Sequence, residues 1–314
     1  MEHRSLGPSD LSVSLVGLGC NNFGNKIGVD DTRAVVDRAL DEGINFFDTA
    51  DVYGKRGGSE ECLGAVMGER RKDIILATKF AMPMSDEPGM RGASRAYIMK
   101  ACEASLKRLK TDWIDLYQVH QPDSETPIEE TMGALDDLIK QGKVRHIGSS
   151  NYSAEQLDEA QDAATGNGWA GFVSCQDHYS LLAREIDDDL LPAITRRGLG
   201  LLPYFPLASG FLTGKYSRQN PPPAGTRMAD MPQLAKRYMT DRNWDIVEGL
   251  EAFAAKHNRS LLELAFAWLA ARPNVSSVIA GATHPDQVTQ NAAAVGWTLG
   301  AAEMAEIDRI TTGD

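Results

Sequence analysis

The sequence lacks the features that mark an exported, membrane-spanning or metal-centred protein. No apolar run approaches the roughly 20 residues that cross a bilayer, and the first residues have neither the basic start nor the long apolar core of a secretory signal. The four cysteines are widely spaced and form no Cys-x-x-Cys pair, which argues against a zinc site or a disulfide framework. These absences predict a soluble, cytoplasmic chain with reduced thiols.

Positive charge is also scarce, because 32 Lys and Arg face 44 Asp and Glu and give a net charge of −12. An acidic surface argues against nucleic acid or an anionic membrane as a partner. One segment departs from this balance: residues 215–237 contain five basic residues and one acid (Lys215, Arg218, Arg227, Lys236, Arg237 and Asp230). The segment is either an ordinary solvated loop or a clamp for a small phosphorylated ligand.

Short β-rich runs alternate with amphipathic stretches along the whole chain, a pattern typical of repeated βα units and a parallel sheet. We expect eight strands, at residues 16–19, 45–48, 74–78, 113–118, 144–149, 172–176, 200–204 and 277–280. We expect helices that include residues 32–42, 59–67, 94–109, 128–141, 154–164, 186–196, 241–257 and 261–271. A short hairpin at residues 6–14 would plug the bottom of the sheet.

The length of 314 residues fits either one large α/β domain or two smaller ones. A doubly wound open sheet would carry a Gly-x-Gly-x-x-Gly turn after its first strand, but the turn at residues 17–22 lacks the third glycine. Eight strands with polar residues at many of their carboxyl ends favour a closed (β/α)8 barrel. We therefore predict one TIM-barrel domain over residues 1–314, with a long functional segment and extra helices between the seventh and eighth strands.

Four polar residues stand at or just past the ends of separate strands. Asp48, Lys79 and His120 each end a short apolar run, and Tyr53 follows Asp48 on a loop. They can meet only if the strands lie side by side in the same direction, as in a barrel whose catalytic groups lie at strand carboxyl ends. The sequence therefore predicts that these residues form one site.

The chemistry of this set is proton donation. A tyrosine has a pKa near 10, so it becomes a useful acid only when a nearby positive charge stabilises the phenolate. Lys79 would supply that charge, Asp48 would hold Lys79 in place, and a neutral His120 would orient a carbonyl oxygen. The set fits protonation of a developing alkoxide, and its lysine and tyrosine are poor zinc ligands.

The same residues lie in motifs that resemble those of the aldo-keto reductases. These are Asp48-Thr49-Ala50-Asp51-Val52-Tyr53-Gly54, Gly58-Ser59-Glu60-Glu61-Cys62-Leu63-Gly64, Thr78-Lys79, Asp115-Leu116-Tyr117-Gln118-Val119-His120 and Gly148-Ser149-Ser150-Asn151-Tyr152. The resemblance runs in order over nearly the whole chain. It implies a (β/α)8 barrel that binds NADP(H) without a Rossmann domain, with Tyr53 as general acid and Asp48, Lys79 and His120 as its partners.

The resemblance also implies a set of cofactor contacts. Ser150, Asn151 and Gln176 would hold the nicotinamide carboxamide, and Tyr204 would stack on the nicotinamide ring. The following segment would wrap the pyrophosphate, through Phe205, Pro206, Leu207, Ala208, Ser209, Gly210, Leu212 and Lys215, with Arg227 near the phosphates. The adenosine end would contact Gly281, Thr283, Gln287 and Asn291.

One departure from the family pattern bears on the cofactor. Many members carry a basic residue just after strand eight for the 2′-phosphate, whereas Gly281-Ala282-Thr283-His284 offers none and Gln287 stands where some members have arginine. NADP(H) is still favoured over NAD(H), because Arg227 can compensate.

Three functions remain open at this level. The first is an NADP(H)-dependent reductase of a small-molecule aldehyde or ketone. The second is a cofactor-binding regulatory subunit like the channel β subunits of the same family, which we disfavour because the chain begins its barrel at once. The third is an alcohol or sugar dehydrogenase that works mainly in the oxidative direction.

The pattern names the walls of the substrate pocket but not the substrate. Residues 21–23, residues 80–91 and parts of the segment after strand seven would line the pocket. Met82, Met84 and Met90 would give it an adaptable apolar surface or simply pack in the core. The chain stops soon after its last helical pattern at Ile310, so we expect an open site. No pattern predicts an oligomeric state.

Overall fold

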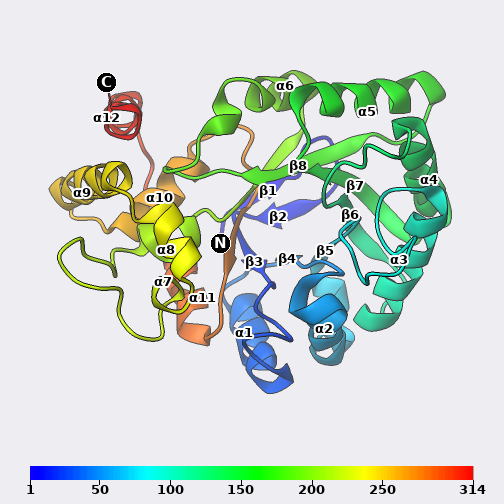
Figure 1. Ribbon diagram of the computed structural model, residues 1–314, viewed down its shortest axis with the longest axis horizontal. Helices are drawn as coiled ribbons and strands as arrows, with labels where there is room; N and C mark the ends of the chain where they lie inside the picture. Colours follow the sequence, from blue (N-terminus) through cyan, green and yellow to red (C-terminus); the bar gives the residue numbers. More distant parts are fainter. Residues whose placement is uncertain (314) are drawn as a thin grey trace.

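Eight parallel strands form the centre of the protein in the computed structural model, which describes residues 1–313 (Figure 1). Each strand pairs with its neighbours in chain order, and β10 pairs with β3. The strands are β3 (Val16–Gly19), β4 (Phe46–Asp48), β5 (Ile75–Phe80), β6 (Ile114–Val119), β7 (Val144–Ser150), β8 (Phe172–His178), β9 (Gly200–Tyr204) and β10 (Val278–Gly281). All eight predicted strands are therefore present, with ends that differ by at most two residues.

The barrel closes through the chain just before β10. The backbone N–H of Leu201 in β9 donates to Asn274 O at 2.6 Å, and the N–H of Ser276 donates to Leu201 O at 3.0 Å. Together with the β10–β3 pairing, these bonds join the two edges of the sheet. The fold is a (β/α)8 TIM barrel, as predicted, and not an open doubly wound sheet.

A hairpin fills the amino-terminal end of the barrel, where the sequence predicted a plug. Its strands are β1 (His3–Ser5) and β2 (Ser12–Ser14). Gly7 has φ +52°, and a Cβ there would lie 2.1 Å from Val173 O, so the close approach of the hairpin to the barrel requires glycine. The hairpin side chains join a separate buried cluster with residues of six strands: Leu6, Leu11, Val13, Phe46, Ala77, Leu116, Val173, Leu202 and Ile279.

Helices surround the barrel and bury their apolar faces against it (Figure 1). Ser94, Ser153 and Ser260 accept hydrogen bonds from the first turns of α3, α5 and α10, so side-chain caps fix where these helices begin. The helices outside the long β9–β10 segment are α1 (Val29–Asp41), α2 (Tyr53–Val66), α3 (Arg95–Leu109), α4 (Ile128–Lys140), α5 (Ala154–Asn167), α6 (Leu190–Arg197), α11 (Pro285–Ala293) and α12 (Ala301–Thr312). Short 3-10 turns span Gly68–Asp73 (η1) and Glu185–Asp187 (η2).

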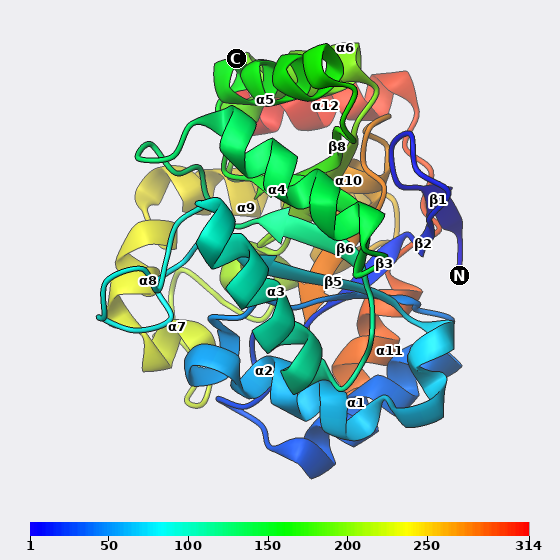
Figure 2. The same cartoon turned by 90° about the vertical axis from the view of Figure 1, so that its right-hand side faces the viewer.

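The long segment between β9 and β10 contains more structure than its sequence pattern predicted. The expected helices are present as α9 (Asp241–Lys256) and α10 (Leu261–Ala270), and they are preceded by η3 (Ala208–Thr213), α7 (Arg227–Asp230) and α8 (Pro232–Tyr238). The last two are too short to show a helical period in the sequence. Figure 2 shows α7 and α8 at the opposite end of the barrel from the β1–β2 hairpin.

The four cysteines are free and buried. Within residues 1–313, no helix combines the length and apolar character needed to cross a membrane.

Candidate active site

Asp48 and Lys79 form a buried ion pair on neighbouring strands. Asp48 is the last residue of β4, and Lys79 lies inside β5, which runs two residues further than predicted because Lys79 and Phe80 pair with β6. Lys79 Nζ lies 2.7 Å from Asp48 Oδ2 and donates to Thr49 O at 2.9 Å. Burial lowers the pKa of Lys79, but the Asp48 carboxylate and the Tyr53 phenol raise it further, so its net pKa is raised and it stays charged at neutral pH.

Two glutamines complete the surroundings of Asp48. Gln118 Nε2 and Gln176 Nε2 donate to Asp48 Oδ1 at 3.2 and 2.8 Å. Three side-chain donors therefore fix the carboxylate, which offsets the cost of burying its charge. Gln118 was not among the predicted site residues, although it lies two residues before His120, so the alternation of a strand places both side chains on the same side of the sheet.

Tyr53 lies beside this pair at the start of α2. Its ring centre is 5.0 Å from Lys79 Nζ and 5.6 Å from the ring centre of His120, with the two planes at 83°. The next four residues, 54–57, all have positive φ, so the chain turns sharply away and the Tyr53 side chain remains at the barrel mouth. Gly54 fits this turn, because a Cβ there would lie 2.4 Å from Ser59 N.

The pKa of Tyr53 is shifted in the direction opposite to the one that Lys79 alone would produce. Burial raises the pKa of Tyr53, and the charge of Lys79 lowers it by less than that. Tyr53 is therefore a protonated phenol at neutral pH, and Lys79 reduces the cost of removing its proton.

His120 follows β6 and is neutral at ordinary pH. Burial and the nearby Lys79 charge lower the pKa of His120 to about 3. Its backbone N–H donates to Phe80 O at 2.9 Å, which joins it to β5. Its buried Nδ1 has no hydrogen-bond partner within residues 1–313. The structure thus brings Asp48, Tyr53, Lys79 and His120 together, as the sequence predicted.

Ser150, Asn151, Gln176 and Tyr204 lie next to this group at the ends of β7, β8 and β9. The Tyr204 hydroxyl donates to Asn151 Oδ1 at 2.8 Å, and Asn151 Nδ2 donates to His120 O at 2.9 Å and to Ser150 Oγ at 3.0 Å. Gln176 uses Nε2 toward Asp48, and its Oε1 accepts no hydrogen bond from residues 1–313. The free amide oxygen of Gln176 can accept a hydrogen bond from a primary amide such as a carboxamide.

The segment after β9 follows a sharply turning path. Phe205, Ala208, Ser209 and Gly210 have φ between +45° and +96°, so the chain curls and η3 forms. Of the residues predicted to wrap the pyrophosphate, Phe205, Pro206, Leu207, Ala208, Ser209, Gly210, Leu212 and Lys215, two are fully buried in the core: Ala208 and Leu212. Their side chains cannot reach a ligand, so any contact from them would come from the backbone.

The basic residues of the same segment divide into two kinds. Arg218 contacts three carboxylates, Asp245 Oδ1 at 2.7 Å, Asp241 Oδ1 at 3.0 Å and Glu248 Oε2 at 3.5 Å. Arg227 has no acidic partner within residues 1–313 and donates to Asn22 Oδ1 at 3.3 Å, across to the loop after β3.

The remaining basic side chains of the segment lie at the surface. Lys215 is exposed, with its ammonium 5.3 Å from the ring centre of Tyr216. Lys236 and Arg237 are also exposed, and Arg237 lies over the ring of Tyr238. Of the five basic residues, only Arg218 is paired with carboxylates within residues 1–313, so an anion can engage Lys215, Arg227, Lys236 or Arg237 without displacing a carboxylate. Arg227 differs from the other three because it reaches across to the loop after β3.

The residues predicted for an adenosine end lie after β10. Thr283 N–H donates to Gln287 Oε1 at 2.8 Å, and Asn291 is buried on α11. Gly281 faces Asn22, whose Nδ2 would lie 3.3 Å from a Cβ at that position. This group therefore borders the loop that Arg227 contacts.

Two buried carboxyl groups near the site were not anticipated. Asp51 lies two residues before Tyr53, neither of its carboxyl oxygens has a hydrogen-bond partner within residues 1–313, and burial and Glu60 raise its pKa to about 8. Burial also raises the pKa of Asp177 to about 7, although it accepts a hydrogen bond from Asn151 N. Asp51 lies in the motif at residues 48–54, whereas the sequence gives no signal for the burial of Asp177.

Only some of the residues predicted to line the substrate pocket are exposed enough to contact a substrate. Phe23 and Phe80 are fully buried, and Phe80 stacks on Tyr117, so these two side chains belong to the core. Met82, Met84 and Met90 are partly exposed on the β5–α3 loop.

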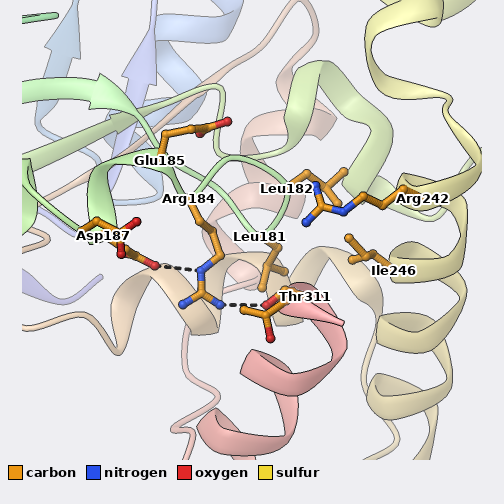
Figure 3. Close-up of a pocket in the computed structure, with 10 residues that line it drawn as sticks. Leu181, Leu182, Arg184, Glu185, Asp187, Arg242, Ile246 and Thr311 are labelled. Carbon is orange, nitrogen blue, oxygen red and sulfur yellow. Dashed lines mark hydrogen bonds and ion pairs between the residues drawn. The ribbon is translucent and has the colours of Figure 1, made fainter. Parts of the chain in front are cut away.

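A cavity of about 460 Å³ lies elsewhere, between the loop after β8, the start of α9 and the end of α12 (Figure 3). Arg184 points into it but is engaged by Asp187, Asp308 and Thr311 at 2.7–2.8 Å. None of the four strand-end residues lines it. Across residues 1–313, no group of three or more His, Cys, Asp or Glu is placed to hold a metal ion.

The fold and site define an α/β barrel with a charged lysine, a protonated tyrosine and a neutral histidine at the carboxyl ends of its strands. The sequence of residues 15–312 matches the Aldo/keto reductase family. The chain belongs to this family, whose members are oxidoreductases that act on carbonyl compounds and generally use NAD(P)H.

Individual relatives carry different names. The chain is 39% identical to a probable voltage-gated potassium channel subunit beta of Oryza sativa subsp. japonica, over 93% of this chain and 90% of the relative. It is 34% identical to an aldo-keto reductase of Bacillus subtilis, over 99% and 93%. It is 32% identical to an L-glyceraldehyde 3-phosphate reductase of Escherichia coli, over 98% and 92%.

Proposed function

We propose that the protein is an NADP(H)-dependent reductase of small aldehydes or ketones, with Tyr53 as the proton donor. The observation that carries the proposal is the position of Lys79, which is buried, charged, 2.7 Å from Asp48 and next to the Tyr53 ring. A fixed positive charge beside a phenol stabilises the phenolate that remains after proton transfer.

Each residue has a separate part in this reaction. The bound nicotinamide supplies the hydride to the carbonyl carbon. Tyr53 gives its proton to the carbonyl oxygen, Lys79 stabilises the resulting phenolate, and Asp48 holds Lys79 charged and in place. His120, which is neutral, orients the carbonyl oxygen by a hydrogen bond, and this positioning supplies much of the rate enhancement.

The side chains around the barrel mouth fit a nicotinamide dinucleotide. Gln176 has a free acceptor for the carboxamide, and Tyr204 offers a half-buried ring for stacking. Arg227 and Lys215, which have no acidic partners within residues 1–313, fit the phosphates. Gly281-Ala282-Thr283-His284 contains no lysine or arginine for a 2′-phosphate. Arg227 would supply that charge instead, which supports NADP(H) over NAD(H).

Comparing the parent with Tyr53→Phe tests the proposal. Initial rates with NADPH and NADH are measured side by side on a panel of small aldehydes and ketones that includes a phosphorylated aldehyde, because one relative is named for such a substrate. We expect turnover by the parent, no measurable turnover by Tyr53→Phe, and NADPH binding by both in a fluorescence titration. Equal turnover by the two proteins would rule out Tyr53 as the acid.

A regulatory subunit that binds the cofactor is the second candidate, and it is supported by the relatives named as channel subunits. An intact set of Asp48, Tyr53, Lys79 and His120 favours the enzyme, because binding alone does not require a proton donor. NADPH binding by the parent without turnover on any carbonyl or alcohol of the panel would favour the subunit.

The same residues permit alcohol oxidation by microscopic reversibility, so the panel includes alcohols with NADP⁺.

We propose that the protein acts in the cytoplasm. The four free, buried cysteines support a reducing compartment.

A further inference from the structure

Tyr204 is the centre of an aromatic group that extends beyond the four strand-end residues. His178, the last residue of β8, stacks on it, with ring centres 5.5 Å apart and planes within 10°. Phe205 meets both rings edge-on, at 5.2 Å from Tyr204 and 6.0 Å from His178. His178 at the end of β8 and Phe205 just after β9 therefore set the orientation of the Tyr204 ring.

Tyr238 connects this group to the long segment after β9. It is the last residue of α8 and is 3% exposed, and its hydroxyl lies 3.3 Å from His178 Nε2 in hydrogen-bond geometry. The same segment also contacts the loop after β3, through Arg227 and Asn22. The segment is thus attached at two points of the barrel mouth, the end of β8 and the loop after β3.

The other edge of Tyr204 is joined to the catalytic candidates. Its hydroxyl donates to Asn151 Oδ1 at 2.8 Å, and Asn151 Nδ2 donates to His120 O at 2.9 Å. A continuous set of contacts therefore runs from Tyr238 through His178, Tyr204 and Asn151 to the backbone of His120.

We propose that His178 and Tyr238 are positioning residues that hold the Tyr204 ring in the orientation that stacks on the nicotinamide. The contact that attaches the β9–β10 segment to the end of β8 would then also align the nicotinamide ring. This inference rests on the proposed function, because Tyr204 acts through a bound nicotinamide.

The charge state of His178 agrees with this role. Burial and the Arg237 charge lower the pKa of His178, opposed by Glu185, so the imidazole is neutral when it stacks. A neutral imidazole can accept a hydrogen bond from the Tyr238 hydroxyl through its unprotonated nitrogen.

Two conservative variants separate the contacts. Tyr238→Phe removes only the hydroxyl, and His178→Phe keeps a ring against Tyr204 but cannot accept the hydrogen bond. We expect each variant to raise the NADPH dissociation rate and Kd about five-fold, as for loss of one neutral hydrogen bond. The Tyr238 hydroxyl also contacts the Ser209 side chain, so the double variant should lose no more than Tyr238→Phe alone, which already removes the bond to His178.

His178→Ala removes the stack as well. We expect it to lower kcat in addition to weakening NADPH binding, because a misaligned nicotinamide reacts more slowly. It should also change the fluorescence of bound NADPH, which a purely structural role would leave unaltered.

Tyr216→Phe is the matched control. Tyr216 lies in the same segment and is buried, and its hydroxyl has no hydrogen-bond partner within residues 1–313, so its NADPH dissociation rate should equal that of the parent. Thermal unfolding of each variant checks that it is folded. If the parent binds NADPH and all three single variants release it at the parent rate, the inference is overturned while the proposed function stands. If the parent does not bind NADPH, both fail.

Discussion

Lys79 and Asp48 form the most deeply buried ion pair of residues 1–313, with side chains 0% and 4% exposed and a separation of 2.7 Å. Such a pair is costly to break, because removing one partner leaves the other charge unpaired in a medium that solvates it poorly. The pair lies near the carboxyl ends of β4 and β5, beside Tyr53. The same two residues therefore contribute to the stability of the fold and to the proposed proton transfer.

Lys79→Met is expected to lower the free energy of unfolding by about 3–5 kcal/mol, because the Asp48 charge is left buried without its cation. It should also abolish carbonyl reduction. Urea unfolding and initial rates measure the two effects. The control is Arg196→Met, since Arg196 pairs with Asp158 at the surface, where ion pairs contribute little. Equal unfolding midpoints for Lys79→Met and the control would contradict the prediction.

The stability of the protein should depend on His120 between pH 6.5 and 3. Its folded pKa of about 3 lies below the ordinary value of 6.5, so the unfolded chain binds the extra proton first and stability falls as the pH is lowered through this window. His120→Gln should remove about 1–2 kcal/mol of the stability difference between pH 7 and pH 5. Urea unfolding at the two pH values tests this, and an unchanged difference would show that His120 titrates normally.

Asp177 should make the stability of the protein depend on pH in the opposite direction. Its folded pKa of about 7 lies above the ordinary value of 3.8, so the folded protein retains a proton that the unfolded chain has lost, and stability falls as the pH rises from about 4 to 7. Asp177→Asn keeps an oxygen that can accept from Asn151 N–H and cannot ionise. The free energy of unfolding of Asp177→Asn minus that of the parent should increase by about 1–3 kcal/mol when the pH is raised from 5 to 8. Thermal or urea unfolding of both proteins at these pH values measures this difference. A difference that is the same at pH 5 and pH 8 would contradict the raised pKa of Asp177.

Arg227 should contribute to the affinity for the phosphates of the cofactor. Arg227→Met is expected to weaken NADPH binding about tenfold, as for loss of a charge-assisted contact, and to weaken NADH binding less if the 2′-phosphate is its partner. Arg218→Met serves as the control, because Arg218 is already bound to Asp241, Asp245 and Glu248. Fluorescence titration with both cofactors gives the comparison. Equal losses for NADPH and NADH would assign Arg227 to the pyrophosphate instead.

The strands were predictable because they are short β-rich runs, many of them followed by a polar residue, and burial in a parallel barrel leaves few other places for such runs. The meeting of Asp48, Tyr53, Lys79 and His120 followed from the same pattern. Helices α7 and α8 were not predictable, because four and seven residues are too few to show a period.

The sequence by itself determined the order of strands and helices, the closed barrel and the residues that gather at its carboxyl end, because these depend on local periodicity and on chain connectivity. Only the tertiary structure decided the states of those residues. Burial raises the pKa of Tyr53 despite Lys79, keeps His120 neutral and leaves Asp177 poorly solvated. The tertiary fold also brings Tyr238 into contact with His178, 60 residues away in the chain. Desolvation and contacts between distant segments exist only after the chain has folded, so no local pattern records them.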